Sequence, residues 1–174
     1  MDFSIDKSIE ILERTPDVVR AMLSGLSAEW IAATEGEDTW SPFDIIGHFI
    51  HGEKTDWIIR AQLILSDQVE KSFVPFDRFA QFENSKGKSV NALLDEFKML
   101  RRINIAVLKS LRIDENKHNE KGIHPDFGEV SLKQLLAAWV VHDLNHISQI
   151  ARVMAKQYTV EVGPWIEYLK ILRQ

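Results

Sequence analysis

Two histidines four residues apart have the clearest chemical meaning in this sequence. They open and close the segment HDLNH, which runs from His142 to His146. On a helix this spacing puts both imidazoles on one face, one turn apart, and two such nitrogens can reach a single metal ion at about 2.0–2.1 Å. The pair predicts either two ligands of a metal or two core histidines, each hydrogen-bonded to a backbone carbonyl or a carboxylate.

The helical face that this pair occupies bears on the choice. Leu135, Trp139 and Ile150 all lie on the same side of the helix as His142, so both histidines would point into an apolar stripe. Burying imidazoles without hydrogen-bond partners is costly. A metal that accepts both lone pairs removes this cost, although helical spacing alone leaves both interpretations open.

A third candidate ligand comes from an earlier helical segment. His48 stands within the stretch Ile45–Ile50, with apolar neighbours on both sides, and Gly52, one turn further on, would leave room for a ligand or a close helix. His51 lies about 60° away around the helix, and we expect it at the boundary or the surface. The pattern therefore favours His48 over His51.

Together, His48, His142 and His146 form the predicted site for one divalent transition metal. Imidazole suits zinc, nickel, copper and iron, and we favour zinc or nickel. Three protein ligands leave coordination positions open, which is typical of catalytic sites, whereas structural zinc sites are closed by four. Asp143 or Asn145 could orient the imidazoles, and no residue is identified as catalytic.

The remaining histidines have simpler interpretations. His118 stands in the charged run 114–121, so we expect it to be solvated. His124 belongs to the segment GIHPDFG before the last long helix. It could line the mouth of the site, although a position on the loop surface is the simpler prediction.

For the charged and aromatic residues as well, a structural role is the first interpretation and a functional role the second. Asp56 and Arg60, four residues apart, predict a surface ion pair, with a buried structural role as the second choice. The cluster of Lys98, Arg101 and Arg102 predicts a solvated helix face. One long connection is rich in phenylalanine and either packs over the end of the molecule or walls an apolar substrate pocket. Its phenylalanines are Phe73, Phe76, Phe79 and Phe82.

Composition limits the class of protein. The net charge is −5 and no basic stripe is present, which argues against a nucleic-acid partner. No apolar stretch approaches the roughly 20 residues that cross a membrane, and the acidic start MDFSID does not resemble a signal peptide, so we expect a cytoplasmic protein without a membrane partner.

The 174 residues suit one domain, 1–174. Because the chain has no cysteine, thiolate ligands and a cysteine nucleophile are excluded, and any thiol chemistry needs a thiol substrate.

Four amphipathic segments must position these side chains. Their apolar residues recur at helical spacing, and three begin at a start signal: Ser41-Pro42, a cap at Ser89 and the S-x-x-Q capping box at Ser131. Pro16 predicts a kink or restart in the first. The expected helices cover about residues 4–26, 41–65, 89–111 and 131–156, followed by a short one after 163. With no convincing strand pattern, the prediction is an all-α helix bundle whose two long connections suit substrate contacts.

The sequence resembles the DinB-like family, the damage-inducible and bacillithiol-transferase type of metal-binding four-helix bundle. The resemblance spans nearly the whole chain and is most specific in the last long helix. The motifs that carry it are HDLNHISQI, WSP, IGH and HPDFG, at residues 142–150, 40–42, 46–48 and 124–128. It implies a four-helix bundle with a long crossover connection, often a homodimer, and one metal held by three histidines, which carry over to His48, His142 and His146.

Function follows from the resemblance as three alternatives. Some members transfer a low-molecular-weight thiol onto electrophiles, which implies a metal-dependent thiol S-transferase in stress response or detoxification, with a small-molecule thiol and an electrophile as partners. A second is a metal-dependent hydrolase, although no general base is evident on the ligand face and HDLNH departs from the H-E-x-x-H protease pattern. The third is a non-catalytic metal-binding stress protein. An open coordination site beside a cleft would favour catalysis, and a closed one would favour structure.

Overall fold

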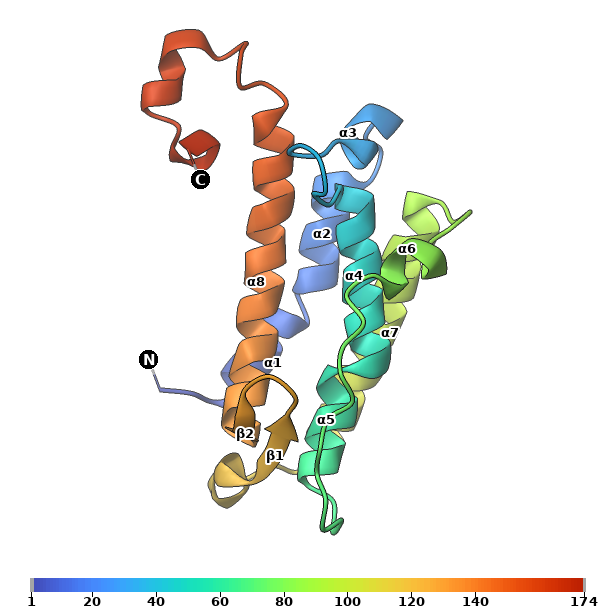
Figure 1. Cartoon of the computed structure of the whole chain (residues 1–174), viewed down its shortest axis with the longest axis vertical. Helices are drawn as coiled ribbons and strands as arrows, with labels where there is room; N and C mark the ends of the chain where they lie inside the picture. Colours follow the sequence, from blue (N-terminus) through green and yellow to red (C-terminus); the bar gives the residue numbers. More distant parts are fainter. Residues whose placement is uncertain (1, 174) are drawn as a thin grey trace.

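The protein is a four-helix bundle with a long crossover, as predicted. The computed structural model describes residues 2–173, and its long helical stretches lie side by side along the longest axis of the molecule (Figure 1). The second and third stretches run in the same direction, because the connection between them returns along the bundle (Figure 1). The stretches are α1 (Ile5–Leu12) with α2 (Thr15–Leu23), α4 (Pro42–Thr55) with α5 (Trp57–Ile64), α7 (Val90–Ser110), and α8 (Leu132–Lys156); α3 (Ala28–Ala32) and α6 (Ala80–Asn84) lie in connections.

The predicted start signals form helix caps. The Ser131 hydroxyl accepts a hydrogen bond from the backbone N–H of Gln134 at 3.2 Å, and the Gln134 side-chain oxygen accepts one from the N–H of Ser131 at 2.8 Å. Ser41 and Asp44 cap each other in the same way, and the Ser89 hydroxyl caps α7. These contacts satisfy N–H groups that have no partner within the helix, so α7 and α8 occupy their predicted ranges.

The second stretch is not the continuous helix that the sequence predicts. It breaks at Asp56, whose backbone angles (φ −118°, ψ −89°) are not helical. A Cβ on Gly52 would lie 3.2 Å from Nε1 of Trp57, so the room at this glycine is used by the Trp57 indole. After the break Ile58 is buried and Ile59 is 51% exposed. The segment is apolar on two sides, so its hydrophobic periodicity shows no interruption at Asp56 and does not predict the break.

A β-hairpin, which the sequence pattern does not predict, precedes α8. Its antiparallel strands are β1 (Lys121–His124) and β2 (Gly128–Ser131). The backbone of Ile123 bonds to the earlier long connection, accepting from the N–H of Phe73 at 2.8 Å and donating to the carbonyl of Lys71 at 2.9 Å. A Cβ on Gly122 would lie 2.4 Å from the Phe73 ring, so this glycine permits the close approach. The two long connections therefore meet at one end of the bundle.

A buried network of charges ties the helical stretches together. Arg101 of α7, predicted to be solvated, is only 1% exposed. Its guanidinium donates to Glu53 of α4 at 2.9 Å, to Asp143 of α8 at 2.5 and 3.1 Å, and to the Leu12 carbonyl of α1 at 2.8 Å. The prediction was wrong because both carboxylates come from distant parts of the chain.

Two apolar clusters fill the bundle, and the paired histidines lie where they meet. One cluster surrounds Trp139 and Trp57, whose rings stack with centroids 5.9 Å apart. The other surrounds Phe49 and Phe97, stacked at 4.8 Å. Along α8 the histidines stand between Trp139 of the first cluster and Ile150 of the second, so a polar centre interrupts an otherwise apolar interior.

The short helix predicted after residue 163 is present in the 3-10 form. It consists of two 3-10 helices, Gly163–Glu167 and Lys170–Arg173, and a further 3-10 helix covers Glu115–Asn119. Trp165 and Tyr168 are largely exposed, so the terminal aromatic residues do not contribute to the core. Within residues 2–173, no helix combines the length and apolar character needed to cross a membrane.

Candidate metal centre

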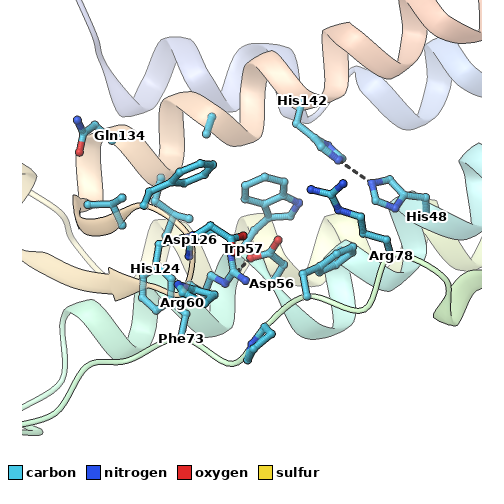
Figure 2. A pocket seen from close by; sticks show the side chains of 18 of the residues that line it. His48, Asp56, Trp57, Arg60, Phe73, Arg78, His124, Asp126, Gln134 and His142 are labelled. Atoms are coloured by element: carbon cyan, nitrogen blue, oxygen red, sulfur yellow. Dashed lines mark hydrogen bonds and ion pairs between the residues drawn. The ribbon is translucent and has the colours of Figure 1, made fainter.

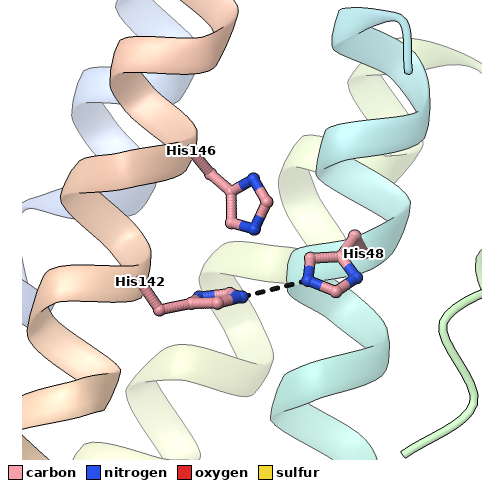
Figure 3. A group of neighbouring side chains, drawn as sticks. All are labelled: His48, His142 and His146. Carbon is pink, nitrogen blue, oxygen red and sulfur yellow. Dashed lines mark hydrogen bonds between the residues drawn. The ribbon is translucent and has the colours of Figure 1, made fainter. Parts of the chain in front are cut away.

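The three predicted ligands converge between α4 and α8. His48 projects from α4 toward His142 and His146, which come from adjacent turns of α8 (Figure 3). The Nε2 atoms of His48 and His142 are 3.0 Å apart. One nitrogen of each ring lies within 4.8 Å of those of the other two, so the structure brings together all three histidines that the sequence singles out.

The nitrogen spacing suits one metal ion. With metal–nitrogen bonds of about 2.0–2.1 Å, a tetrahedral site separates its ligand atoms by about 3.3 Å, which falls between the 3.0 Å contact and the 4.8 Å limit of this cluster. The Nδ1 atoms of His48 and His142 are buried and, among the described residues, have no hydrogen-bond partner. The Asp143 carboxylate lies 3.8 Å from Nδ1 of His142, too far for a hydrogen bond. His142 is therefore not held by a nearby carboxylate in the way that the alternative of two core histidines expects.

His146 is oriented by a residue that the sequence analysis missed. Its Nδ1 lies 2.7 Å from the side-chain oxygen of Gln149. An amide oxygen only accepts hydrogen bonds, so Nδ1 donates and the lone pair of the ring is on Nε2. Metal-ligating histidines are commonly held by such a second contact. Asp143, one of the two residues considered for orienting an imidazole, pairs with Arg101 instead. Gln149 could have been identified as the partner of His146 because residues three apart lie on the same face of a helix.

Burial keeps His48 and His146 in the neutral form that can bind a metal. Removal from water, followed by repulsion from the neighbouring imidazoles, lowers the pKa of His48 to about 2 and the pKa of His146 to about 4. At pH 7 protons therefore do not compete for their lone pairs. The His142 side chain is the most accessible of the three, at 21% exposed, and it marks the side on which the cluster opens.

The cluster forms one end of a large pocket (Figure 2). The pocket volume is about 1170 Å³, and its walls come from α4, α5, α8, the hairpin and the connection that follows α5. The three histidines are therefore not sealed inside the core. The side chains that line the remainder of the pocket include the aromatic residues Trp57, Phe73, Phe76 and Phe127 and the charged residues Asp56, Arg60, Arg78 and Asp126.

Asp56 and Arg60 form a buried ion pair in this pocket, not the surface pair that the sequence predicts. Each residue is 7% exposed, and Arg60 Nε lies 2.7 Å from Asp56 Oδ1. Arg60 also donates to the carbonyl of Val74 at 3.2 Å and lies over the Phe73 ring, 5.0 Å from its centroid. The prediction was wrong because the connection after α5, which covers the pair, has no sequence signal for its position.

The other histidines also depart from expectation. His124 lines the pocket, the second of the two positions considered for it, and stacks on Phe127 with centroids 4.5 Å apart. His51, predicted at the boundary or surface, is only 9% exposed because Phe76 lies against it at 4.8 Å. His118 is half-buried against Phe3, at 5.2 Å, and is not fully solvated. None of these three joins the cluster formed by the predicted ligands.

The phenylalanine-rich connection divides between two roles. Phe73 is buried beneath the hairpin, and Phe76 contacts the ring of His48 at 5.4 Å; both line the pocket. Phe79 and Phe82 are exposed and stack on each other at 6.3 Å. The connection therefore walls the pocket with its first two aromatic rings only.

Comparisons with known proteins agree with this architecture. The sequence model of the DinB superfamily matches residues 11–150. YfiT from Bacillus subtilis, described as a probable metal-dependent hydrolase with an unusual four-helix bundle topology, superposes with a TM-score of 0.77 at 20% identity, covering 90% of each chain. TT2238, described as a four-helix bundle protein, gives a TM-score of 0.57 at 19% identity, covering 85% of this chain and 98% of its own. At these identities the two structures show the fold alone. No curated protein matches the sequence.

Proposed function

The chain belongs to the DinB superfamily, and from that premise we propose that it is a metal-dependent enzyme that transfers a small thiol onto an electrophile. In this proposal His48, His142 and His146 hold one divalent transition metal, zinc or nickel. The observation that carries it is the cluster of three imidazoles at the end of an open pocket. An ion held there would act as a Lewis acid and favour the deprotonated, nucleophilic form of a thiol.

The residues present suit this metal. Three imidazole nitrogens match the ligand preference of zinc and nickel, and the Nε2 atoms of His48 and His142 face each other at 3.0 Å. Gln149 fixes the ring of His146. The chain itself therefore orients one of the three proposed ligands before any ion binds.

The open pocket supports a catalytic role over a purely structural one. A structural zinc site is closed by four protein ligands, whereas three protein ligands here face a pocket of about 1170 Å³. This volume exceeds the roughly 300–1,000 Å³ typical of a site for one drug-sized ligand, so it can admit a thiol and an electrophile together. The chain has no cysteine that would compete for the ion.

Hydrolysis is the second candidate, and one observation favours it. The carboxylate of Asp56, which the sequence analysis did not place near the ligands, lines the same pocket as the three histidines. Burial raises the pKa of Asp56, while its partner Arg60 acts in the opposite direction. A carboxylate so placed could accept a proton from water during hydrolysis. The description of YfiT as a probable metal-dependent hydrolase agrees with this alternative.

Parallel assays separate the candidates. Protein loaded with zinc or nickel is offered a panel of small thiols with chlorodinitrobenzene, and separately a panel of esters and amides without thiol. Thiol conjugation that requires the metal and is absent from the triple variant His48→Ala/His142→Ala/His146→Ala supports the transferase. Metal-dependent ester or amide cleavage without conjugation supports the hydrolase. Fully loaded protein with no turnover above the triple variant in either assay contradicts both.

A further inference from the structure

One arginine in the pocket has no ion-pair partner among residues 2–173. Arg78 lines the pocket together with the three histidines, and Figure 2 shows its guanidinium beside His48 and His142. Burial lowers the pKa of His48 most, and the other histidines lower it next. The positive charge of Arg78 is close enough to lower it further. Within residues 2–173 no carboxylate forms an ion pair with Arg78, and no acceptor forms a hydrogen bond with its side chain.

The neighbouring charges are accounted for in other ways. Arg60, in the same pocket, is paired with Asp56 at 2.7 Å, and Glu129 of the hairpin is paired with Lys121 at 2.6 Å. Asp126 lies toward the hairpin end of the pocket, away from Arg78 (Figure 2). The Asp77 carboxylate, next to Arg78 in the chain, does not line the pocket and accepts a hydrogen bond from the backbone N–H of Phe79 at 2.9 Å. The end of the pocket that holds the histidines therefore carries the positive charge of Arg78 without an ion-pair partner in the described residues.

Apolar surface adjoins this charge. Phe76, two residues before Arg78, packs against the rings of His48 and His51, and Trp57 and Phe73 continue the aromatic wall of the pocket. A guanidinium pairs well with a carboxylate because its planar N–H groups match the two oxygens. The local chemistry suits a molecule with a carboxylate at one end and an apolar body.

We propose that Arg78 binds the carboxylate of a substrate whose apolar part lies along the aromatic wall formed by Trp57, Phe73 and Phe76. The proposal rests on the proposed function, in that it names the substrate class of the same pocket: small organic carboxylates with an apolar body. Recognition by Arg78 uses only groups of this chain, so it also operates in metal-free protein.

The test compares an acid with its uncharged counterpart in metal-free protein. Dissociation constants of 4-phenylbutanoate and 4-phenylbutanamide are measured by NMR titration, without metal so that the carboxylate cannot act as a metal ligand. Because Arg78 is an exposed residue, the wild type should bind the acid up to about fivefold more tightly than the amide, the upper range of an exposed ion pair. Arg78→Gln should lose this preference with amide binding unchanged, and Arg78→Lys should restore part of it.

Matched controls make the outcome specific. Arg102 is an exposed arginine of α7 that does not line this pocket, so Arg102→Gln should leave the preference intact. Equal binding of acid and amide by the wild type, no measurable binding of the acid, or a preference that survives Arg78→Gln would each overturn the proposal. Metal content is measured in the same preparations: a wild type that takes up no metal contradicts the proposed function, whereas loss of the acid preference with normal metal uptake contradicts only the role of Arg78.

Discussion

The three histidines of the cluster could be predicted residue by residue because each carries a local signal. The spacing of His142 and His146 and the apolar face around them place both rings inward, and the apolar flanks of His48 do the same for the third ring. The partner of His146 was missed, although Gln149 lies at a spacing that permits a contact along one helix. The roles of Asp56 and Arg78 had no local signal, because a connection with no regular periodicity brings them to the pocket.

The contact between Gln149 and His146 leads to a prediction about affinity. Gln149→Leu removes the acceptor that holds the His146 ring, so the zinc dissociation constant should rise by about 10-fold or more, as for the loss of other outer contacts of metal-ligating histidines. Ser148→Ala changes the adjacent exposed residue of α8 and serves as the control. Competition with a chromophoric chelator measures both variants, and equal affinities would show that Gln149 does not position the ring.

The lowered histidine pKa values predict how stability depends on pH. In the metal-free protein His48 and His146 resist protonation down to pKa values of about 2 and about 4, whereas in the unfolded chain both take up protons near the ordinary histidine pKa of 6.5. The unfolded state therefore binds more protons, and stability falls as the pH decreases below 6.5. From pH 7.5 to 5.5 each group should remove about 1.4 kcal/mol from the free energy of unfolding.

Urea unfolding of metal-free protein at the two pH values measures this effect. The variant His48→Gln, which has no titrating ring at that position, should lose about 1.4 kcal/mol less than the wild type over the same interval. An identical pH dependence in both proteins would mean that His48 titrates normally in the folded state.

At the scale of elements, the helix start signals and the restart at Pro16 were predicted correctly, whereas the break at Asp56 was missed. The caps at Ser89 and Ser131 define where α7 and α8 begin, because a cap depends on neighbouring residues alone. The break at Asp56 and the hairpin before α8 depend on contacts with remote parts of the chain, such as the bonds between Ile123 and the connection after α5. Such contacts leave no periodic pattern in the sequence.

Arg101 illustrates the same limit and gives a prediction about stability. Arg101→Met would leave Glu53 and Asp143 buried without their counter-charge, which should lower the free energy of unfolding by roughly 3–5 kcal/mol. Arg102→Met, one residue along α7 and exposed, should change it by less than about 0.5 kcal/mol. Chemical unfolding of both variants tests the difference.

A second variant separates the loss of charge pairing from the loss of packing. Adding Glu53→Gln and Asp143→Asn to Arg101→Met removes the unpaired charges, so the triple variant should recover part of the lost stability. If the single Arg101→Met variant were as stable as the wild type, the network would contribute nothing to holding the four helical stretches together.

At the scale of the molecule, the four-helix bundle was predictable and the pocket was not. Helical periodicity along four segments, together with the resemblance to the DinB-like family, defined the bundle. The pocket depends on the positions of the two long connections at one end of the bundle. Contacts of Phe73 with Gly122 and Ile123 of the hairpin hold the two connections together. The homodimer implied by the resemblance stays a prediction, and light scattering would test it by giving a mass twice that of the chain.

Metal binding should stabilise the whole fold. An ion that binds only the folded state raises the free energy of unfolding by about 4 kcal/mol when its free concentration is 1,000 times the dissociation constant. Zinc or nickel should therefore raise the melting temperature of the wild type, and a chelator should reverse the change. His142→Ala should melt at the same temperature with and without metal. A similar shift in that variant would indicate binding elsewhere on the surface.

The most direct test of the central claim is the metal stoichiometry of the purified protein. Metal-free wild type is dialysed against zinc or nickel, and bound metal is measured by mass spectrometry beside the single variants His48→Ala, His142→Ala and His146→Ala. The three-histidine centre predicts one equivalent in the wild type and a substantial loss in every variant. A wild type without bound metal, or variants that all retain a full equivalent, would contradict it.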